Sequence, residues 1–285
     1  MKFFFNSIAL KTAVLALVTL TLFFLAYLPV FQILLNVWIE SEEYSHAFLV
    51  LPIILYMVWS RRAVFQENQI RYPAVGLVLL VVSTLFYPIA LLSQMRTVIA
   101  FSMFLTVIGA IVYLAGAKTL KELYTPLLLL VMLIPVPNQF FIQITFPLQL
   151  KVSQISEVLV QFFEVAIFRE GNVMNIPGRS FEVVRACSGL RSMIVLVTLS
   201  VIMGYFMLQK LSSKLILVVA SVPTAIFVNI IRVTGMILLF HYYKLDLSNG
   251  VLHTATGLLI FSIAMLTLFA LLKVLGLWEK KSNSS

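Results

Sequence analysis

Residues 215–240 read LILVVASVPTAIFVNIIRVTGMILLF, and Arg232 is the one charged side chain in this stretch. About 20 apolar residues in helical conformation span the roughly 30 Å hydrocarbon core of a bilayer. The stretch therefore predicts a transmembrane helix. Similar apolar stretches recur from the N-terminus to Trp278. The sequence thus predicts an all-α, polytopic membrane protein.

The composition of the whole chain points the same way. The 285 residues are 61% hydrophobic and 11% charged, whereas soluble domains carry about 25% charged residues. A soluble enzyme, a collagen-like chain and a disordered tail are excluded. The single cysteine, Cys187, excludes an internal disulfide and a multi-cysteine metal site. Because His-Glu-x-x-His, Gly-rich phosphate-loop and redox-pair motifs are absent, we expect no cofactor and no metal site.

We expect about eight transmembrane helices in a single domain that covers residues 1–285. Their approximate bounds are 12–35, 46–59, 73–92, 97–115, 123–134, 189–208, 215–240 and 252–274. Between the fifth and sixth helices, the mixed polar and apolar residues 138–168 predict an amphipathic helix in the membrane interface. Turn signals at 171–172 and 177–178 predict a short hairpin on the outer, periplasmic membrane surface. The interfacial helix and outer loop should cover about 138–186, and a catalytic core about 181–260.

The distribution of charge predicts an orientation in the membrane. With both termini in the cytoplasm, the cytoplasmic side receives twelve Lys and Arg residues against three acidic residues, and the outer side receives eight against eight. The net charge of +9 then lies entirely on the cytoplasmic side, as the positive-inside bias predicts. We therefore expect a multi-pass protein of the plasma (inner) membrane that contacts lipids and binds no nucleic acid.

Three reactive side chains fall at one membrane depth on consecutive predicted helices, at the outer surface. Cys187 opens one helix, where the helix dipole favours a thiolate. Arg232 lies inside the next helix, where a charge costs at least about 2.5 kcal/mol on insertion scales, so a function is favoured. His253 opens the third helix and can carry protons near neutral pH. A space-filling Cys187 and an Arg232 that reaches the lipid headgroups are the structural alternatives.

Several polar neighbours are candidates for supporting or substrate-binding roles. Asn229 shares a helix face with Arg232. Arg185 and Arg191 flank the cysteine and could tune its thiol, receive the substrate or bind lipid phosphates. The complete supporting set is Asn229, Ser188, Gly189, Arg185, Arg191 and His46.

Taken in order along the chain, these motifs resemble the exosortase/archaeosortase family of membrane cysteine transpeptidases. The matching words are Tyr44-Ser45-His46, Ile134-Pro135-Val136-Pro137, Glu182-Val183-Val184, Ala186-Cys187-Ser188-Gly189-Leu190-Arg191, Asn229-Ile230-Ile231-Arg232, and His253 with Gly257. The resemblance implies a catalytic Cys187, Arg232 and His253. It also implies exported protein substrates with a C-terminal sorting tail, which consists of a short motif, a transmembrane helix and a basic cluster.

The expected function is cleavage of that tail through a thioacyl-enzyme intermediate, by a membrane-embedded cysteine protease or transpeptidase. The sequence does not indicate whether an amine or water attacks the intermediate, that is, whether the reaction is transpeptidation or hydrolysis. A transporter or lipid flippase that holds an anionic substrate on Arg232 is the alternative from another class. A membrane acyltransferase would share the thioester but not the peptide substrate.

Overall fold

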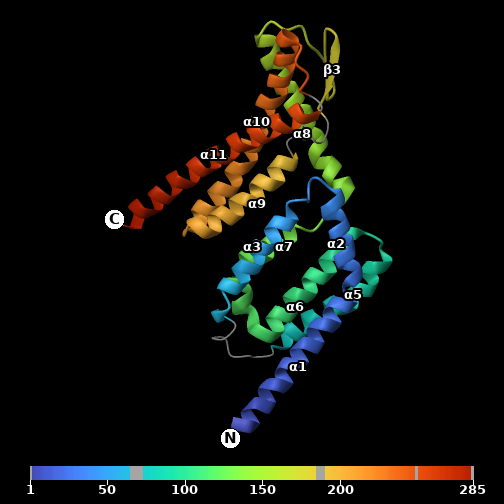
Figure 1. Cartoon of the computed structure of the whole chain (residues 1–285), viewed down its shortest axis with the longest axis vertical. Coiled ribbons are helices and arrows are strands. Elements are labelled where there is room, and N and C mark those ends of the chain that lie inside the picture. Colours follow the sequence, from blue (N-terminus) through green and yellow to red (C-terminus); the bar gives the residue numbers. More distant parts are fainter. Residues whose placement is uncertain (1, 65–72, 184–189, 248–249, 284–285) are drawn as a thin grey trace. The chain divides into compact units, whose positions relative to one another are not determined.

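A computed structural model describes residues 2–64, 73–183, 190–247 and 250–283 of the chain (Figure 1). Most of these residues are helical. The chain divides into two compact units, Met1–Pro137 and Asn138–Ser285. The boundary follows the Ile134-Pro135-Val136-Pro137 sequence, whose prolines cannot continue a helix.

The described part of the first unit consists of helices joined by turns and short loops. Its helices are α1 (Lys2–Ala26), α2 (Leu28–Glu40), α3 (Ala47–Ser60), α5 (Ala74–Leu92), α6 (Arg96–Glu122) and α7 (Tyr124–Met132). α1 and α2 meet at Tyr27 with a bend of 60°. Pro29 stands in the first turn of α2, where its ring and its missing N–H prevent a continuous helix from α1. A second kink lies in α6 at Gly116, whose φ of 82° suits glycine alone.

α5 and α6 pack closely because two glycines allow their backbones to approach. A Cβ atom on Gly76 would lie 2.5 Å from the backbone nitrogen of Tyr113. A Cβ atom on Gly109 would lie 2.8 Å from the Cα atom of Leu80. Small residues at such positions are a common way to pack helices in lipid, where apolar burial gives little attraction between helices.

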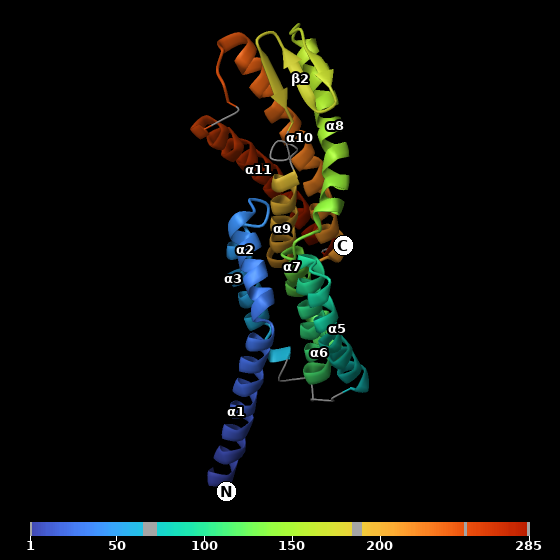
Figure 2. The same cartoon turned by 90° about the vertical axis from the view of Figure 1, so that its right-hand side faces the viewer.

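In the described part of the second unit, four helices combine with a small sheet. In chain order the elements are α8 (Asn138–Phe162), β1 (Phe168–Glu170), β2 (Val173–Ile176), β3 (Arg179–Glu182), α9 (Leu190–Met207), α10 (Leu211–Tyr243) and α11 (Gly250–Asn283). The three strands are antiparallel in the order β1-β2-β3, with Glu170 opposite Val173 and Ile176 opposite Arg179. Figure 2 shows β2 beside α8.

The predicted hairpin is confirmed in β2 and β3, and β1 adds a strand that the sequence pattern did not reveal. Both predicted turns form. Gly171 and Gly178 have φ values of 64° and 88°, a region that favours glycine. The predicted amphipathic helix forms as α8, which ends at Phe162, before β1 begins.

α10 is the central helix of this unit because it contributes to two hydrophobic clusters. Ile230, Val233 and Ile237 pack with α8 and the sheet. Leu217, Ala225 and Val228 pack with α9 and α11. Arg232 follows Val228 by four residues, so it continues the stripe that faces α9 and α11.

The expected count of eight transmembrane helices is not confirmed. Among the described residues, α5, α6, α10 and α11 are long and apolar enough to cross a membrane, and a bent α1–α2 pair would be a fifth span. α3 has 14 residues and α7 has 9. Fourteen helical residues reach only about 21 Å, short of the hydrocarbon core. The all-α membrane architecture stands, with fewer full-length spans than expected.

Candidate functional site

Arg232 and His253 are in direct contact between α10 and α11. Nη2 of Arg232 lies 3.0 Å from Nε2 of His253. His253 stands in the first turns of α11, and Gly257 lies one turn further along the same face. A Cβ atom at position 257 would lie 3.5 Å from Nη2 of Arg232, so the guanidinium group lies directly against α11 there.

The neighbours of the imidazole ring determine which nitrogen carries its proton. A guanidinium group can only donate hydrogen bonds, so Nε2 of His253 must accept from Arg232. Nδ1 lies 3.2 Å from the backbone oxygen of Leu247, which can only accept, so Nδ1 must carry the proton. Both contacts therefore select the same neutral tautomer, with Nδ1 protonated. Its Nε2 lone pair is directed at Arg232.

The guanidinium group of Arg232 has a hydrogen-bond donor that the contact with His253 does not use. Its Nε atom is buried and has no hydrogen-bond partner among the described residues. A buried donor without a partner costs about 1–3 kcal/mol, so such an atom is suited to a ligand. Asn229, one turn earlier on α10, is also buried. This corner of the second unit thus offers a spare charged donor beside a neutral histidine.

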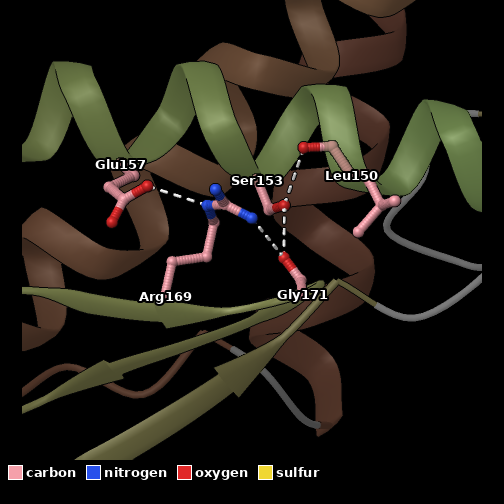
Figure 3. Close-up of polar contacts among 5 residues, drawn as sticks. All are labelled: Leu150, Ser153, Glu157, Arg169 and Gly171. Atoms are coloured by element: carbon pink, nitrogen blue, oxygen red, sulfur yellow. Dashed lines mark hydrogen bonds and ion pairs between the residues drawn. The ribbon is translucent and has the colours of Figure 1, made fainter.

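The sheet is fixed to α8 by a group of polar contacts (Figure 3). Nε of Arg169 donates to a carboxylate oxygen of Glu157 at 2.8 Å, and Nη1 donates to the carbonyl oxygen of Gly171. The hydroxyl group of Ser153 donates to the same carbonyl oxygen at 3.1 Å. These contacts hold the β1–β2 turn against α8.

Val183, the residue that follows β3, is held by the same turn. The backbone nitrogen of Val183 donates to the carbonyl oxygen of Asn172, and the Asn172 side chain donates back to Val183 O at 3.2 Å. Val183 is the last residue described before the segment with Cys187. The sheet therefore fixes the position from which the chain enters that segment.

β3 also contacts the connection between α10 and α11. Arg179 forms an ion pair with Asp246, with Nη1 and Oδ2 separated by 2.8 Å. The rings of Phe181 and Phe240 meet edge to face at 5.5 Å, and the Arg179 guanidinium group lies over the Phe240 ring. Asp246 immediately precedes Leu247, whose carbonyl oxygen meets His253. None of these contact residues was predicted, since an ion pair between distant segments and a backbone carbonyl leave no local pattern.

The other predicted site residues are distributed as follows. Cys187, Arg185, Ser188 and Gly189 lie outside the described residues. Arg191 is exposed in the first turn of α9. His46 precedes α3 in the first unit and is partly buried. The structure therefore brings together Arg232 and His253 among the predicted catalytic residues. Within the described ranges, no group of three His, Cys, Asp or Glu side chains could hold a metal ion.

Comparison with known proteins identifies the family. Residues 38–270, well over half of the chain, match the model of the transmembrane exosortase family (EpsH). No curated protein and no solved structure matches the sequence. The match and the long apolar helices together show a multi-pass membrane protein. The chain belongs to the transmembrane exosortase family.

Proposed function

We propose that this protein is a membrane-embedded cysteine transpeptidase that cleaves the C-terminal sorting tail of exported proteins. Exosortases are in general cysteine transpeptidases that act on proteins with such tails. The observation that carries the proposal is the 3.0 Å contact between Arg232 and His253, two of the three residues that the family resemblance implies. Cys187, the only cysteine of the chain, supplies the nucleophile.

The proposed reaction starts when the scissile carbonyl oxygen of a bound substrate draws the Arg232 guanidinium group away from Nε2 of His253. The freed Nε2 lone pair then accepts the Cys187 thiol proton. The thiolate then attacks the scissile carbonyl carbon of the substrate. As the imidazole becomes cationic it repels Arg232, whose N–H groups donate to the developing oxyanion. The unpartnered Nε of Arg232 is an additional donor for this oxygen. His253 gives its Nε2 proton to the departing amine, and the C–N bond breaks to leave a thioester on Cys187.

The thioester is resolved by a second nucleophile. An acceptor amine gives a new amide bond, whereas water gives a free carboxylate. In both cases the nucleophile loses a proton to Nε2 of His253, and that proton returns to the Cys187 sulfur. The reaction needs no redox step.

In the proposed orientation both termini are cytoplasmic and the site lies at the outer face. Two contacts in the second unit support this assignment. At the start of α10, the backbone nitrogen of Lys210 donates to Glu279, and both residues were assigned to the cytoplasmic side. Near the other end of α10, Arg179 pairs with Asp246, and both were assigned to the outer side. The tail helix of a substrate would dock in the membrane with its basic cluster in the cytoplasm. The whole chain of the enzyme would form a single catalytic domain.

The test is coexpression with a tagged protein that ends in a sorting tail. Cys187→Ala, Arg232→Ala and His253→Ala should each lower processing by at least about 1,000-fold, because these groups act as one unit. His241→Ala, which removes the histidine at the end of α10, is the matched control and should process normally. Wild-type enzyme trapped with substrate should carry an acyl adduct on Cys187, detectable by mass spectrometry. Normal processing by Cys187→Ala would refute the proposal.

A further inference from the structure

The tautomer of His253 matters throughout the proposed reaction because every proton transfer takes place at Nε2. The Nδ1–H group remains bonded to the carbonyl oxygen of Leu247 from the neutral ring to the imidazolium ion. A ring with the opposite tautomer would carry its proton at Nε2 and could not accept the thiol proton there. Leu247 O therefore acts with Arg232 to set whether His253 can act as the base, and it is the contact that remains when Arg232 turns to the substrate.

Leu247 lies in the connection between α10 and α11, and a contact with β3 helps to hold this connection in place. α10 ends at Tyr243. The next residue, Lys244, has a left-handed φ of 56°, and Leu245 N closes the helix by donating to Leu239 O. The next residue, Asp246, makes the ion pair with Arg179 of β3. The Leu247 side chain is buried, at 5% exposure. Each of three successive residues is thus fixed by a different contact.

We propose that Arg179 and Asp246 form a positioning pair that holds the Leu247 carbonyl oxygen against Nδ1 of His253 and thereby selects the reactive tautomer. Neither side chain touches the reacting atoms. The pair joins β3, which leads into the segment with Cys187, to the loop that orients the base. Contact between Phe181 and Phe240 supports the same junction. This inference rests on the proposed function of the site.

The chain provides a matched control for this pair. Arg169 and Glu157 also join the sheet to a neighbouring element, again at 2.8 Å. Their side chains are 25% and 20% exposed, compared with 31% for Arg179 and 35% for Asp246. Both pairs should contribute similarly to stability, but only Arg179–Asp246 lies next to the loop that contacts His253. A difference between the two pairs would therefore report positioning rather than stability.

The first experiment measures the tautomer directly and does not depend on activity. The chain has three histidines, so a His46→Gln/His241→Gln variant labelled with ¹⁵N-histidine reports His253 alone. Arg232→Ala is added to every variant in this experiment, so that the contact with Leu247 O is tested without the hydrogen bond from Arg232 to Nε2. Two-bond ¹⁵N–¹H couplings identify the protonated ring nitrogen. We expect the Nδ1–H form in this background, a mixture of both forms after Asp246→Asn, and no change after Arg169→Gln. A pure Nδ1–H form in the Asp246→Asn variant would overturn the proposal.

The second experiment measures turnover of a purified tail-bearing substrate in detergent micelles. Asp246→Asn should lower kcat about 10-fold, because misplacement of a reacting group lowers the rate steeply, and should leave KM unchanged. Asp246→Glu should restore part of the loss. Arg179→Gln should match Asp246→Asn, and the double variant should be no slower than either, because the residues act as one pair. Equal kcat values for Asp246→Asn and Arg169→Gln would overturn the positioning role. Full activity of His253→Ala would instead refute the proposed function and leave the tautomer result intact.

Discussion

The two compact units use different polar contacts to hold their helices. In the first unit, neutral groups meet the segment that follows α7: Trp38 donates to Leu133 O at 3.1 Å, and the hydroxyl of Tyr44 accepts from Val136 N at 2.9 Å. In the second unit, charged groups make the comparable contacts. Arg169 and Arg179 anchor the sheet, and Glu279 accepts from the backbone before α10.

This difference indicates that the second unit is the one that accommodates buried charged groups. Neutral hydrogen bonds and close backbone approach suffice to join apolar helices. A charged group inside an apolar protein is costly unless it is paired, and the second unit pairs its charges at both ends of α10. Arg232 lies in this unit, in contact with His253. The predictions below test whether the first unit depends on backbone approach and neutral bonds, and the second on charge.

The largest loss of stability is expected from Gly76→Ala in the first unit. The new Cβ atom would overlap backbone atoms of Tyr113, so α5 and α6 must separate, at a cost of about 3 kcal/mol. The free energy of unfolding can be measured by SDS titration in detergent micelles with tryptophan fluorescence. Gly276→Ala is the control, because nothing lies within 4 Å of its Cβ position. Equal stability of the two variants would show that α5 and α6 are not in backbone contact.

An intermediate loss is expected from Glu279→Gln in the second unit. The carboxylate is 6% exposed and accepts from the backbone nitrogens of Gln209 and Lys210, both at 2.9 Å. An amide loses the charge and can offer only one acceptor oxygen, which should cost about 2 kcal/mol in the same titration. Glu122→Gln is the control, because its pair with Arg61 is exposed and solvent-screened, worth about 0.5 kcal/mol or less. Similar losses in the two variants would remove the role given to buried charge.

The smallest loss is expected from Tyr44→Phe in the first unit. This change removes the hydroxyl group that accepts a hydrogen bond from the backbone N–H of Val136, at a cost of about 1 kcal/mol. Tyr124→Phe is the control, because that side chain is 48% exposed, and its stability should equal that of wild type. If the Tyr44→Phe variant is as stable as this control, other contacts hold the segment 134–137 in place.

Much of the fold followed from local patterns in the sequence. The apolar stretches gave the positions of α5, α10 and α11, and the glycine turns gave β2 and β3, because helix length and positive φ are local properties. The number of full-length spans did not follow. Pro29 breaks the predicted 12–35 helix, and α3 and α7 are too short to cross the hydrocarbon core. Strand β1 was missed because its residues, Phe168–Glu170, carry no alternating pattern longer than three positions.

The sequence by itself determined that this chain is an α-helical membrane protein of the exosortase family, and it selected Arg232 and His253 as candidates. These are consequences of composition, of motif order and of the cost of a charge in an apolar helix. Only the tertiary structure decided how the pair is arranged. The contact from Arg232 to Nε2, the Leu247 oxygen on Nδ1 and the Arg179–Asp246 ion pair join segments far apart in the chain. Such contacts depend on how helices and strands pack, and this packing cannot be deduced from any local stretch of sequence.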